Sequence, residues 1–336
     1  MIISIICKSS IQIGLGHLIR SYSFAEQISK TFPEIKIVFN LIGDKNFQNI
    51  LTNPKIVYRF FENDSSLAIT EYSDITFLDM TEIDGIALQR VKQQTSKIVL
   101  LSPVFNHLDQ IDYLFSRTKY LGFSPTDYPN LKIYSSFEYT IIRENCISIN
   151  AGEYERNLFS SPFPIAISMG GGDASNKTFE VVQALKKCKT RLMFWVLIGH
   201  GYNHSLDALL KEIRLHSQHE IILAHTANSM WQILKNCALC VLPGGITTYE
   251  AVFAGLPSIN FSYNSSQQFL IKELVEKNAA FDFGVYSEEV LTDICSFIEG
   301  ISQNPRTLLE MHVYTKYLID GNGSIRILNT ILSDGK

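Results

Sequence analysis

The chain has 336 residues, of which 46% are hydrophobic and 18% charged, a composition typical of a well-buried folded protein and not of a disordered one. Its 29 Lys and Arg residues nearly balance its 33 Asp and Glu residues, for a formal net charge of -4. No concentrated basic stripe appears, so we expect no nucleic-acid partner. The length exceeds what one hydrophobic core usually supports, which predicts two domains.

The first apolar segment, residues 1–7, has no basic region before it and is too short to cross a bilayer. We therefore interpret it as a buried strand, and we expect a cytoplasmic protein without an integral membrane segment.

The six cysteines include one C-x-x-C pair, Cys237 and Cys240, which lies in an apolar segment. On a strand, side chains three residues apart point to opposite faces, which is poor geometry for a shared metal ion or a disulfide. No second pair or nearby histidines complete a zinc site. We expect no metal, no cofactor and six reduced thiols.

Short apolar segments alternate with amphipathic helical ones along the whole chain. Several of the apolar segments are almost wholly hydrophobic, which suits strands covered on both faces. This alternation predicts an α/β fold with doubly wound parallel sheets. The first half is expected to hold strands at 2–7, 35–41, 75–79, 97–101 and 112–115 and helices at 17–30 and 84–94. The second half is expected to hold strands at 164–169, 192–198, 220–223, 238–242 and 257–261, a helix at 175–187 and terminal helices within 306–332.

Residues 150–163 combine a glycine, several charges, paired serines and a proline, which is a composition typical of a linker. We therefore predict an N-terminal domain over 1–157 and a C-terminal domain over 158–310. The terminal helices, residues 311–336, can pack back on the N-terminal domain.

Three glycine-rich segments follow predicted strands, at the sheet edge where open α/β sheets bind ligands. The first contains Gly14, Gly16 and His17. The glycines permit backbone angles closed to other residues and let a ligand approach the main chain. An imidazole at a helix start can act as a general base. The alternative is an ordinary turn in which His17 caps the helix.

The second segment contains Gly171, Gly172, Asp173, Ser175 and Asn176. Its glycines expose backbone N–H groups, and the helix that follows adds its positive end, so both favour a phosphate. Asp173 or Ser175 can also cap the helix. Capping and anion binding are compatible.

The third segment contains Gly244, Gly245 and Thr247, with Glu250 about one helical turn further on. It predicts a second anion site, with Glu250 placed to accept hydrogen bonds from a ribose. The spacing matches neither the dinucleotide fingerprint nor the P-loop. Gln267 and Gln268 are candidates for contacts with a sugar. The alternative is a solvated helix N-terminus.

Four blocks of this sequence resemble the UDP-sugar hydrolase of pseudaminic acid biosynthesis and the related spore-coat polysaccharide proteins. The blocks are residues 12–20, 139–144, 171–176 and 243–257. The last block also resembles the MurG-type glycosyltransferases, whereas the first two favour the hydrolase branch.

The resemblance implies a GT-B fold, in which two Rossmann-like domains face a cleft and no metal is used. It implies that His17 activates water and that the C-terminal domain holds UDP. It also implies Gly14, Gly16 and Arg143 for the sugar side, Gly244, Gly245 and Thr247 for the diphosphate, Glu250 for ribose and the backbone near Leu223 and Ala224 for uracil. Further candidate substrate-binding residues in the matching blocks are Arg20, Gly171, Gly172, Asp173 and Asn176.

The family usually carries Asp-x-Tyr at the end of an N-domain strand, whereas this chain has Asp79 followed by Met80 and Thr81. Asp79 is expected to hold the imidazole of His17 or the sugar.

The predicted reaction is inverting, metal-independent hydrolysis of a UDP-linked amino and deoxy sugar, of the UDP-2,4-diacetamido-2,4,6-trideoxyhexose type. It would serve nonulosonic-acid or surface-polysaccharide biosynthesis. The alternatives are an inverting glycosyltransferase that uses an acceptor and a non-catalytic subunit that binds a sugar nucleotide.

Overall fold

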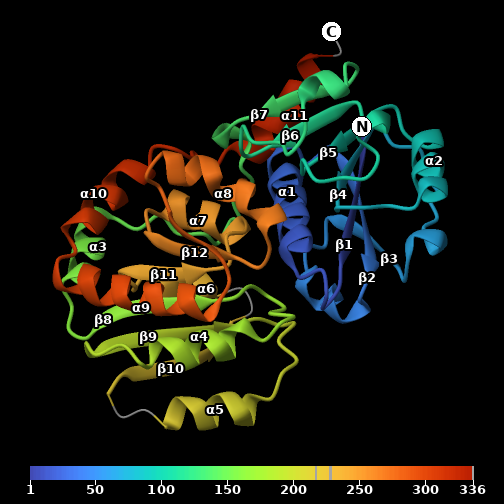
Figure 1. The fold of residues 1–336 in the computed structure, drawn as a ribbon. Coiled ribbons are helices and arrows are strands. Elements are labelled where there is room, and N and C mark those ends of the chain that lie inside the picture. The colour runs from blue at the N-terminus through green and yellow to red at the C-terminus, as the bar shows by residue number, and fades with distance from the viewer. Residues whose placement is uncertain (216–217, 227–228, 335–336) are drawn as a thin grey trace. The chain divides into compact units, whose positions relative to one another are not determined.

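The computed structural model describes residues 1–215, 218–226 and 229–334, apart from the side chains of residues 266 and 267. The chain forms two compact α/β units (Figure 1). Unit 1 comprises Met1–Glu144 together with the C-terminal segment from Gly321 onward, and unit 2 comprises Asn145–Asp320.

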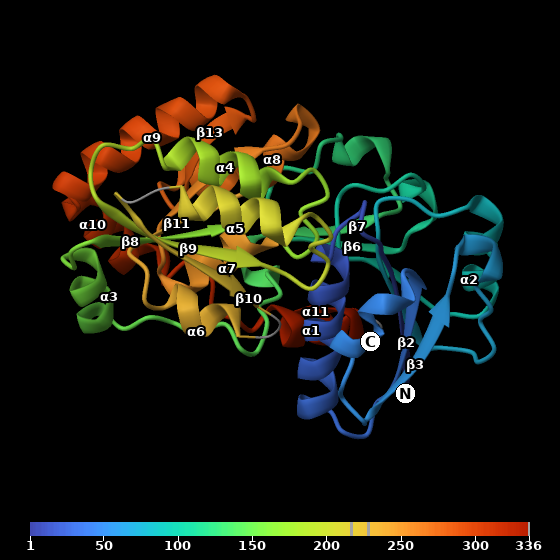
Figure 2. The same ribbon diagram turned by 90° about the horizontal axis from the view of Figure 1, so that it is seen from below.

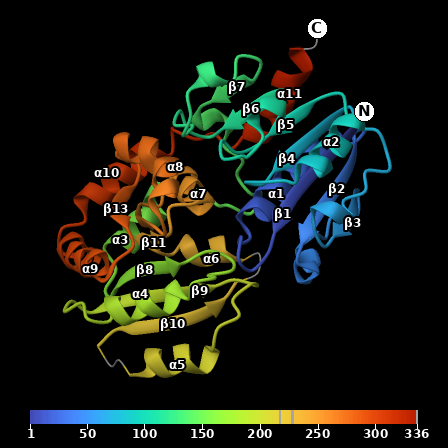
Figure 3. The same ribbon diagram turned by 45° about the vertical axis from the view of Figure 1, so that its right-hand side comes forward.

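Unit 1 is built on a parallel sheet in the order β3-β2-β1-β4-β5-β6-β7 (Figure 3). The order reverses between β1 and β4, so this is the switch point of a doubly wound sheet. The strands are β1 (Ile2–Ser9), β2 (Lys36–Gly43), β3 (Ile56–Phe61), β4 (Ile75–Asp79), β5 (Ile98–Leu100), β6 (Tyr113–Ser116) and β7 (Lys132–Ser135), and the helices are α1 (Gly16–Thr31), α2 (Gly85–Gln93) and α11 (Gly323–Ser333).

Both faces of this sheet are covered, because successive side chains of its strands point to opposite sides. From β1, Ile3 and Ile5 pack with residues of α1 and α11, whereas Ile6 packs with residues of α2. The near-continuous hydrophobic strands of the sequence follow from this double coverage.

Unit 2 has a parallel sheet in the order β10-β9-β8-β11-β12-β13, with its switch point between β8 and β11. Helices α4 and α9 lie on one side of it and α3 and α6 on the other (Figure 2). Its strands are β8 (Phe163–Ser168), β9 (Leu192–Ile198), β10 (Glu220–His225), β11 (Leu239–Leu242), β12 (Ser258–Ser262) and β13 (Phe281–Val285), and its helices are α3 (Ala151–Leu158), α4 (Lys177–Leu185), α5 (Leu206–Arg214), α6 (Met230–Leu234), α7 (Ile246–Ala254), α8 (Ser265–Glu276), α9 (Glu288–Gln303) and α10 (Arg306–Thr315).

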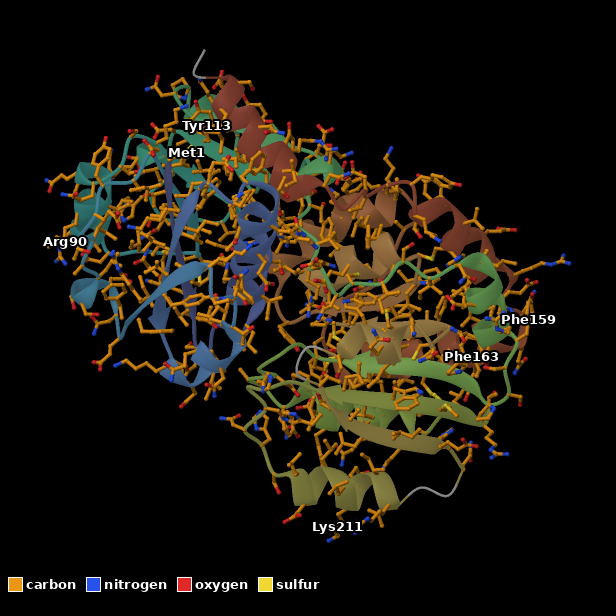
Figure 4. All side chains as sticks on the ribbon, turned by 180° about the vertical axis from the view of Figure 1, so that it is seen from behind. Met1, Arg90, Tyr113, Phe159, Phe163 and Lys211 are labelled. Carbon is orange, nitrogen blue, oxygen red and sulfur yellow. A yellow bond between two sulfur atoms is a disulfide. The ribbon has the colours of Figure 1, made fainter. Side chains whose placement is uncertain are left out.

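The segment predicted to be a linker contains helix α3, so that interpretation is wrong. Asn150 caps this helix by accepting a hydrogen bond from the backbone N–H of Glu153 at 2.8 Å, and Tyr154 and Leu158 are buried. Phe159 after the helix is exposed, whereas Phe163 at the start of β8 is buried (Figure 4).

The division of the chain differs from the predicted boundary at 157/158, because it falls between Glu144 and Asn145. Helix α3 packs against β8 and α10, which keeps it in unit 2. The two terminal helices separate, since α10 belongs to unit 2 and α11 to unit 1.

The expectation of six reduced thiols is wrong for Cys188 and Cys295, which form a disulfide in unit 2. The two residues are far apart in sequence and are brought together only by tertiary packing of α4 against α9. Cys237 and Cys240 are buried thiols that contact different backbone carbonyls, those of Ile233 and Pro257. No helix in the described ranges combines the length and the apolar character that a membrane span requires.

Candidate active site

The turn between β1 and α1 places His17 at the switch point of unit 1. Gly14 adopts a φ of 87°, and its N–H donates to the carbonyl of Ser10 at 2.8 Å. This left-handed conformation closes the turn tightly and starts α1 at Gly16. Asp79 ends β4, which pairs directly with β1. The imidazole and the carboxylate therefore meet at the carboxyl edge of the sheet.

The Asp79 carboxylate is fully buried and lies at the centre of a hydrogen-bond network. Its Oδ1 is 2.6 Å from Nδ1 of His17, and its Oδ2 accepts from Nε of Arg20 at 2.8 Å and from the Ser21 hydroxyl at 2.9 Å. Nη2 of Arg20 also donates to Oδ1. His17, Arg20 and Ser21 are three and four residues apart, so they share one face of α1.

The network keeps Asp79 charged. Burial alone would raise the pKa of this carboxyl group, but the positive charge of Arg20, the neighbouring His17 and their hydrogen bonds hold the pKa well below its usual value. An ionised carboxylate can only accept hydrogen bonds, and the Arg20 guanidinium can only donate them.

The tautomer of His17 follows from these partners. Nδ1 must carry its proton to donate to Asp79, so Nε2 is left with a lone pair. The His17 side chain is 18% exposed, whereas Asp79 is wholly enclosed. A neutral imidazole held in this way can accept a proton through Nε2, the chemistry of a general base.

Arg20 was predicted to bind the substrate. In the structure its side chain is buried and its guanidinium donates to Asp79. Sequence reasoning missed Ser21, although a serine four residues after a helical histidine is a detectable signal. Arg143 is half-buried in unit 1, and Thr81, at the position of the missing tyrosine, is exposed.

In unit 2, the glycine-rich turn after β8 folds around its own side chains. The Asp173 carboxylate accepts from the backbone N–H groups of Lys177 at 2.7 Å and Thr178 at 2.9 Å, the first two residues of α4, whose N-cap residue is Asn176. Asn176 accepts from the Tyr202 hydroxyl at 3.1 Å. The two side chains thus stabilise the turn, and this structural role is compatible with binding of an anion by the backbone.

The backbone of this turn is closely packed. A methyl carbon added to Gly199 would lie 2.6 Å from Cα of Gly171, so the loop after β9 is held directly against the turn. The N–H of Gly201 donates to the carbonyl of Gly171 at 2.9 Å. Gly172, also predicted to lie beside the phosphates, is buried.

The turn after β11 begins α7 and lies next to the turn after β8, because β11 and β8 are neighbours in the sheet. Gly244 has a φ of 69°, and Gly245 is the N-terminal cap residue of α7. Thr247 is half-buried in the first turn of the helix. The N-terminus of α7 contains no acidic residue in its first turn, so its N–H groups and positive dipole end favour an anion.

The remaining predicted contacts are distributed over unit 2. Glu250 lies on α7 with 1% of its surface exposed. Leu223 and Ala224 are half-buried on the edge strand β10, and Gln268 donates to Asp282 at 3.3 Å. The side chain of Gln267 lies outside the described part of the structure.

No protein-family model matches the chain. The spore coat polysaccharide biosynthesis protein SpsG of Bacillus subtilis is 23% identical over 99% of this chain and 98% of its own length. An uncharacterized protein of Methanocaldococcus jannaschii is 24% identical over 82% of this chain, which covers 59% of the length of that protein.

Among solved structures, MurG of Acinetobacter baumannii superposes with a TM-score of 0.65 at 14% identity, covering 98% of this chain and 99% of MurG. HepE of Anabaena in complex with UDP-glucose superposes with a TM-score of 0.64 at 14% identity, with the same coverage. The chain has the GT-B fold. Both GT-B units carry their glycine-rich turns at the switch points of their sheets.

Proposed function

We propose that the chain is an enzyme that hydrolyses a UDP-sugar with inversion at the anomeric carbon and without a metal ion. The observation that carries the proposal is the His17–Asp79 pair, in which a buried, charged carboxylate holds one imidazole nitrogen and leaves the other free. The similarity to SpsG and to UDP-bound GT-B structures supports a sugar nucleotide as the substrate.

Unit 2 would bind UDP at its two glycine-rich turns. Gly244, Gly245 and Thr247 present backbone N–H groups and the positive end of α7 to the diphosphate, which stabilises the charge that develops on the leaving phosphate. Glu250 would hold the ribose, and the backbone at Leu223 and Ala224 would contact the uracil.

Unit 1 would supply the base. Nε2 of His17 takes a proton from water as the water oxygen attacks the anomeric carbon, and the bond from this carbon to the diphosphate oxygen breaks. The products are the free sugar and UDP. Asp79 stabilises the imidazolium that forms, as in other His–Asp pairs. Gly14, Gly16 and Arg143 would line the sugar side, and a diacetamido-trideoxyhexose is the sugar that the resemblance favours.

A glycosyltransferase is the second candidate, with an acceptor hydroxyl in place of water. Three exposed apolar residues of unit 1 favour it: Ile13 after β1, Ile86 at the start of α2 and Val104 after β5 are 50%, 67% and 39% exposed. If these side chains form one patch, that patch would suit an acceptor with an apolar group.

The deciding experiment follows UDP release from UDP-HexNAc and UDP-diacetamido-trideoxyhexose donors without an acceptor. We expect release of UDP and free sugar by the wild type. His17→Ala should lose at least 100-fold in kcat, the scale of one general base. His107→Ala removes another imidazole of unit 1 and should keep near-normal turnover.

Two outcomes contradict hydrolysis. Undiminished release by a folded His17→Ala variant removes the base from the mechanism. If the protein binds UDP tightly but releases no UDP from these donors, either with a chelator or with divalent cations, the transferase is supported instead.

A further inference from the structure

Three side chains of types that can ligate a metal ion lie together in unit 2, away from the glycine-rich turns. They are Cys188, Cys295 and Glu299, whose ligand atoms all lie within 4.8 Å of one another. Cys188 is 1% exposed, and the other two are half-buried. An ion bound here can therefore be enclosed on one side and reached from solvent on the other.

The sequence spacing suits a shared ion. Cys295 and Glu299 are four residues apart on α9, so their side chains lie one above the other on the same helical face. Cys188 approaches this face from the turn between α4 and β9. A pair of ligands one helical turn apart, completed by a third from another segment, is a common arrangement in zinc sites.

Neighbouring groups hold these ligands in place. The backbone N–H of Lys189 donates to Oε1 of Glu299, which orients the carboxylate and leaves Oε2 for a ligand. The Gln218 side chain donates to the carbonyls of Cys188 and Lys189 at 2.7 Å each, which fixes the turn that carries the thiol. The hydrogen bond to the Glu299 carboxylate is of the kind that orients ligands in metal sites.

We propose that, in the reduced protein, Cys188, Cys295 and Glu299 bind one zinc ion, with water as the fourth ligand. Two thiolates and one carboxylate are a ligand set that favours zinc over magnesium or calcium. Binding releases the two thiol protons to solvent. The ligands carry three negative charges against the two of the ion, and the exposed Lys187 and Lys189 flank Cys188 in sequence.

The position of the site assigns it a structural role. Cys188 precedes β9 and so lies at the amino edge of the sheet, whereas the glycine-rich turns follow β8 and β11 at the carboxyl edge. The ion joins the turn after α4 to α9 and takes no part in the chemistry at the other edge. Because the disulfide uses the same two sulfur atoms, metal binding and disulfide formation exclude each other.

The test uses Co²⁺ as a spectroscopic probe of the full-length protein, reduced with a phosphine and with all six thiols counted. We expect one Co²⁺ per chain, a thiolate-to-cobalt charge-transfer band and the visible absorption of a four-coordinate ion, both removed by Zn²⁺. Oxidised protein should show no band.

Variants assign the ligands independently of any enzyme activity. Cys188→Ser and Cys295→Ser should lose the band, and Glu299→Gln should weaken binding about 10-fold or more with the fold intact. Cys237→Ser and Glu289→Gln, which alter a buried thiol elsewhere and a carboxylate at the start of α9, should bind as the wild type does. A missing band in fully reduced wild type, or a band that survives in Cys295→Ser, overturns the proposal.

Discussion

At the scale of single residues, Asp79 determines which tautomer His17 adopts. Its carboxylate accepts from three side chains while it is completely buried, so it functions as a fixed negative charge. Arg20 and Ser21 donate hydrogen bonds to this carboxylate, and Nη2 of Arg20 also lies 3.4 Å from Nδ1 of His17, so in the proposed mechanism both are positioning residues.

Asp79→Asn should reduce kcat by about 10³–10⁴, because an amide cannot enforce the Nδ1-protonated tautomer. It also leaves the buried Arg20 without its counter-ion, which is expected to cost about 3–5 kcal/mol of unfolding free energy. Kinetics and chemical denaturation measure the two effects. A variant with normal kcat would show that the pair is not required.

The same substitution changes the acid response. The pKa of Asp79 is lowered in the folded state relative to an unfolded value of about 3.9. Its stabilisation is therefore complete above that value and is lost as the pH falls toward the folded pKa. The wild type should lose stability more steeply than Asp79→Asn below about pH 4, and parallel curves would contradict this.

Part of the site could be predicted from sequence. Gly14, Gly16 and His17 follow a buried strand, and Asp79 ends another, so each is recognisable as a candidate at a sheet edge. Their contact with each other depends on the order of β1 and β4, which is a tertiary property. For the same reason the pairing of Cys188 with Cys295 left no local signal.

At the scale of elements, the turn before α7 is the feature that the phosphate proposal depends on. A Cβ atom on Gly245 would meet nothing within 4 Å, and its φ of -106° is open to any residue. A glycine here leaves the N–H groups open to close approach of a ligand, as the phosphate proposal requires.

Gly245→Ala should leave the melting temperature of the protein nearly unchanged and weaken UDP binding about 10-fold or more, measured by calorimetry. Gly300→Ala is the matched control, since a Cβ atom there also meets nothing within 4 Å. It lies inside α9, where alanine should stabilise the helix by about 0.5–1 kcal/mol without changing UDP binding. Equal UDP affinity in both variants would place the diphosphate elsewhere.

The strands missed by sequence patterns share a physical property. Strands β3, β7 and β13 lie at or beside sheet edges and are mostly half-buried, so their hydrophobic signal is weak. The central strands are buried on both faces and were predicted within a few residues. Helix α3 was missed because its polar surface and Gly152 resemble a linker.

At the scale of the whole molecule, unit 1 is discontinuous in sequence. Ile327, Leu328 and Ile331 of α11 belong to the same core as β1 and α1. The N-terminus of α11 packs so closely that a Cβ atom on Gly323 would lie 2.2 Å from the carbonyl oxygen of Thr140. The last helix is therefore an integral part of the first unit.

Gly323→Ala should destabilise unit 1, because the backbone of α11 or that of Tyr139 and Thr140 must move to admit the methyl group. Hydrogen exchange should increase in β1 and α1, with UDP binding by unit 2 retained. Equal protection in the variant and the wild type would contradict the close packing.

The late position of α11 in the sequence also sets the timing of biogenesis. A nascent chain emerging from the ribosome holds all seven strands of unit 1 long before residues 323–333 are synthesised. During that interval the apolar face that α11 covers is without its partner, and unit 2 emerges and can fold first. Completion of the first domain thus waits until the whole of unit 2 and then α11 have been synthesised, and until then its core lacks one covering helix.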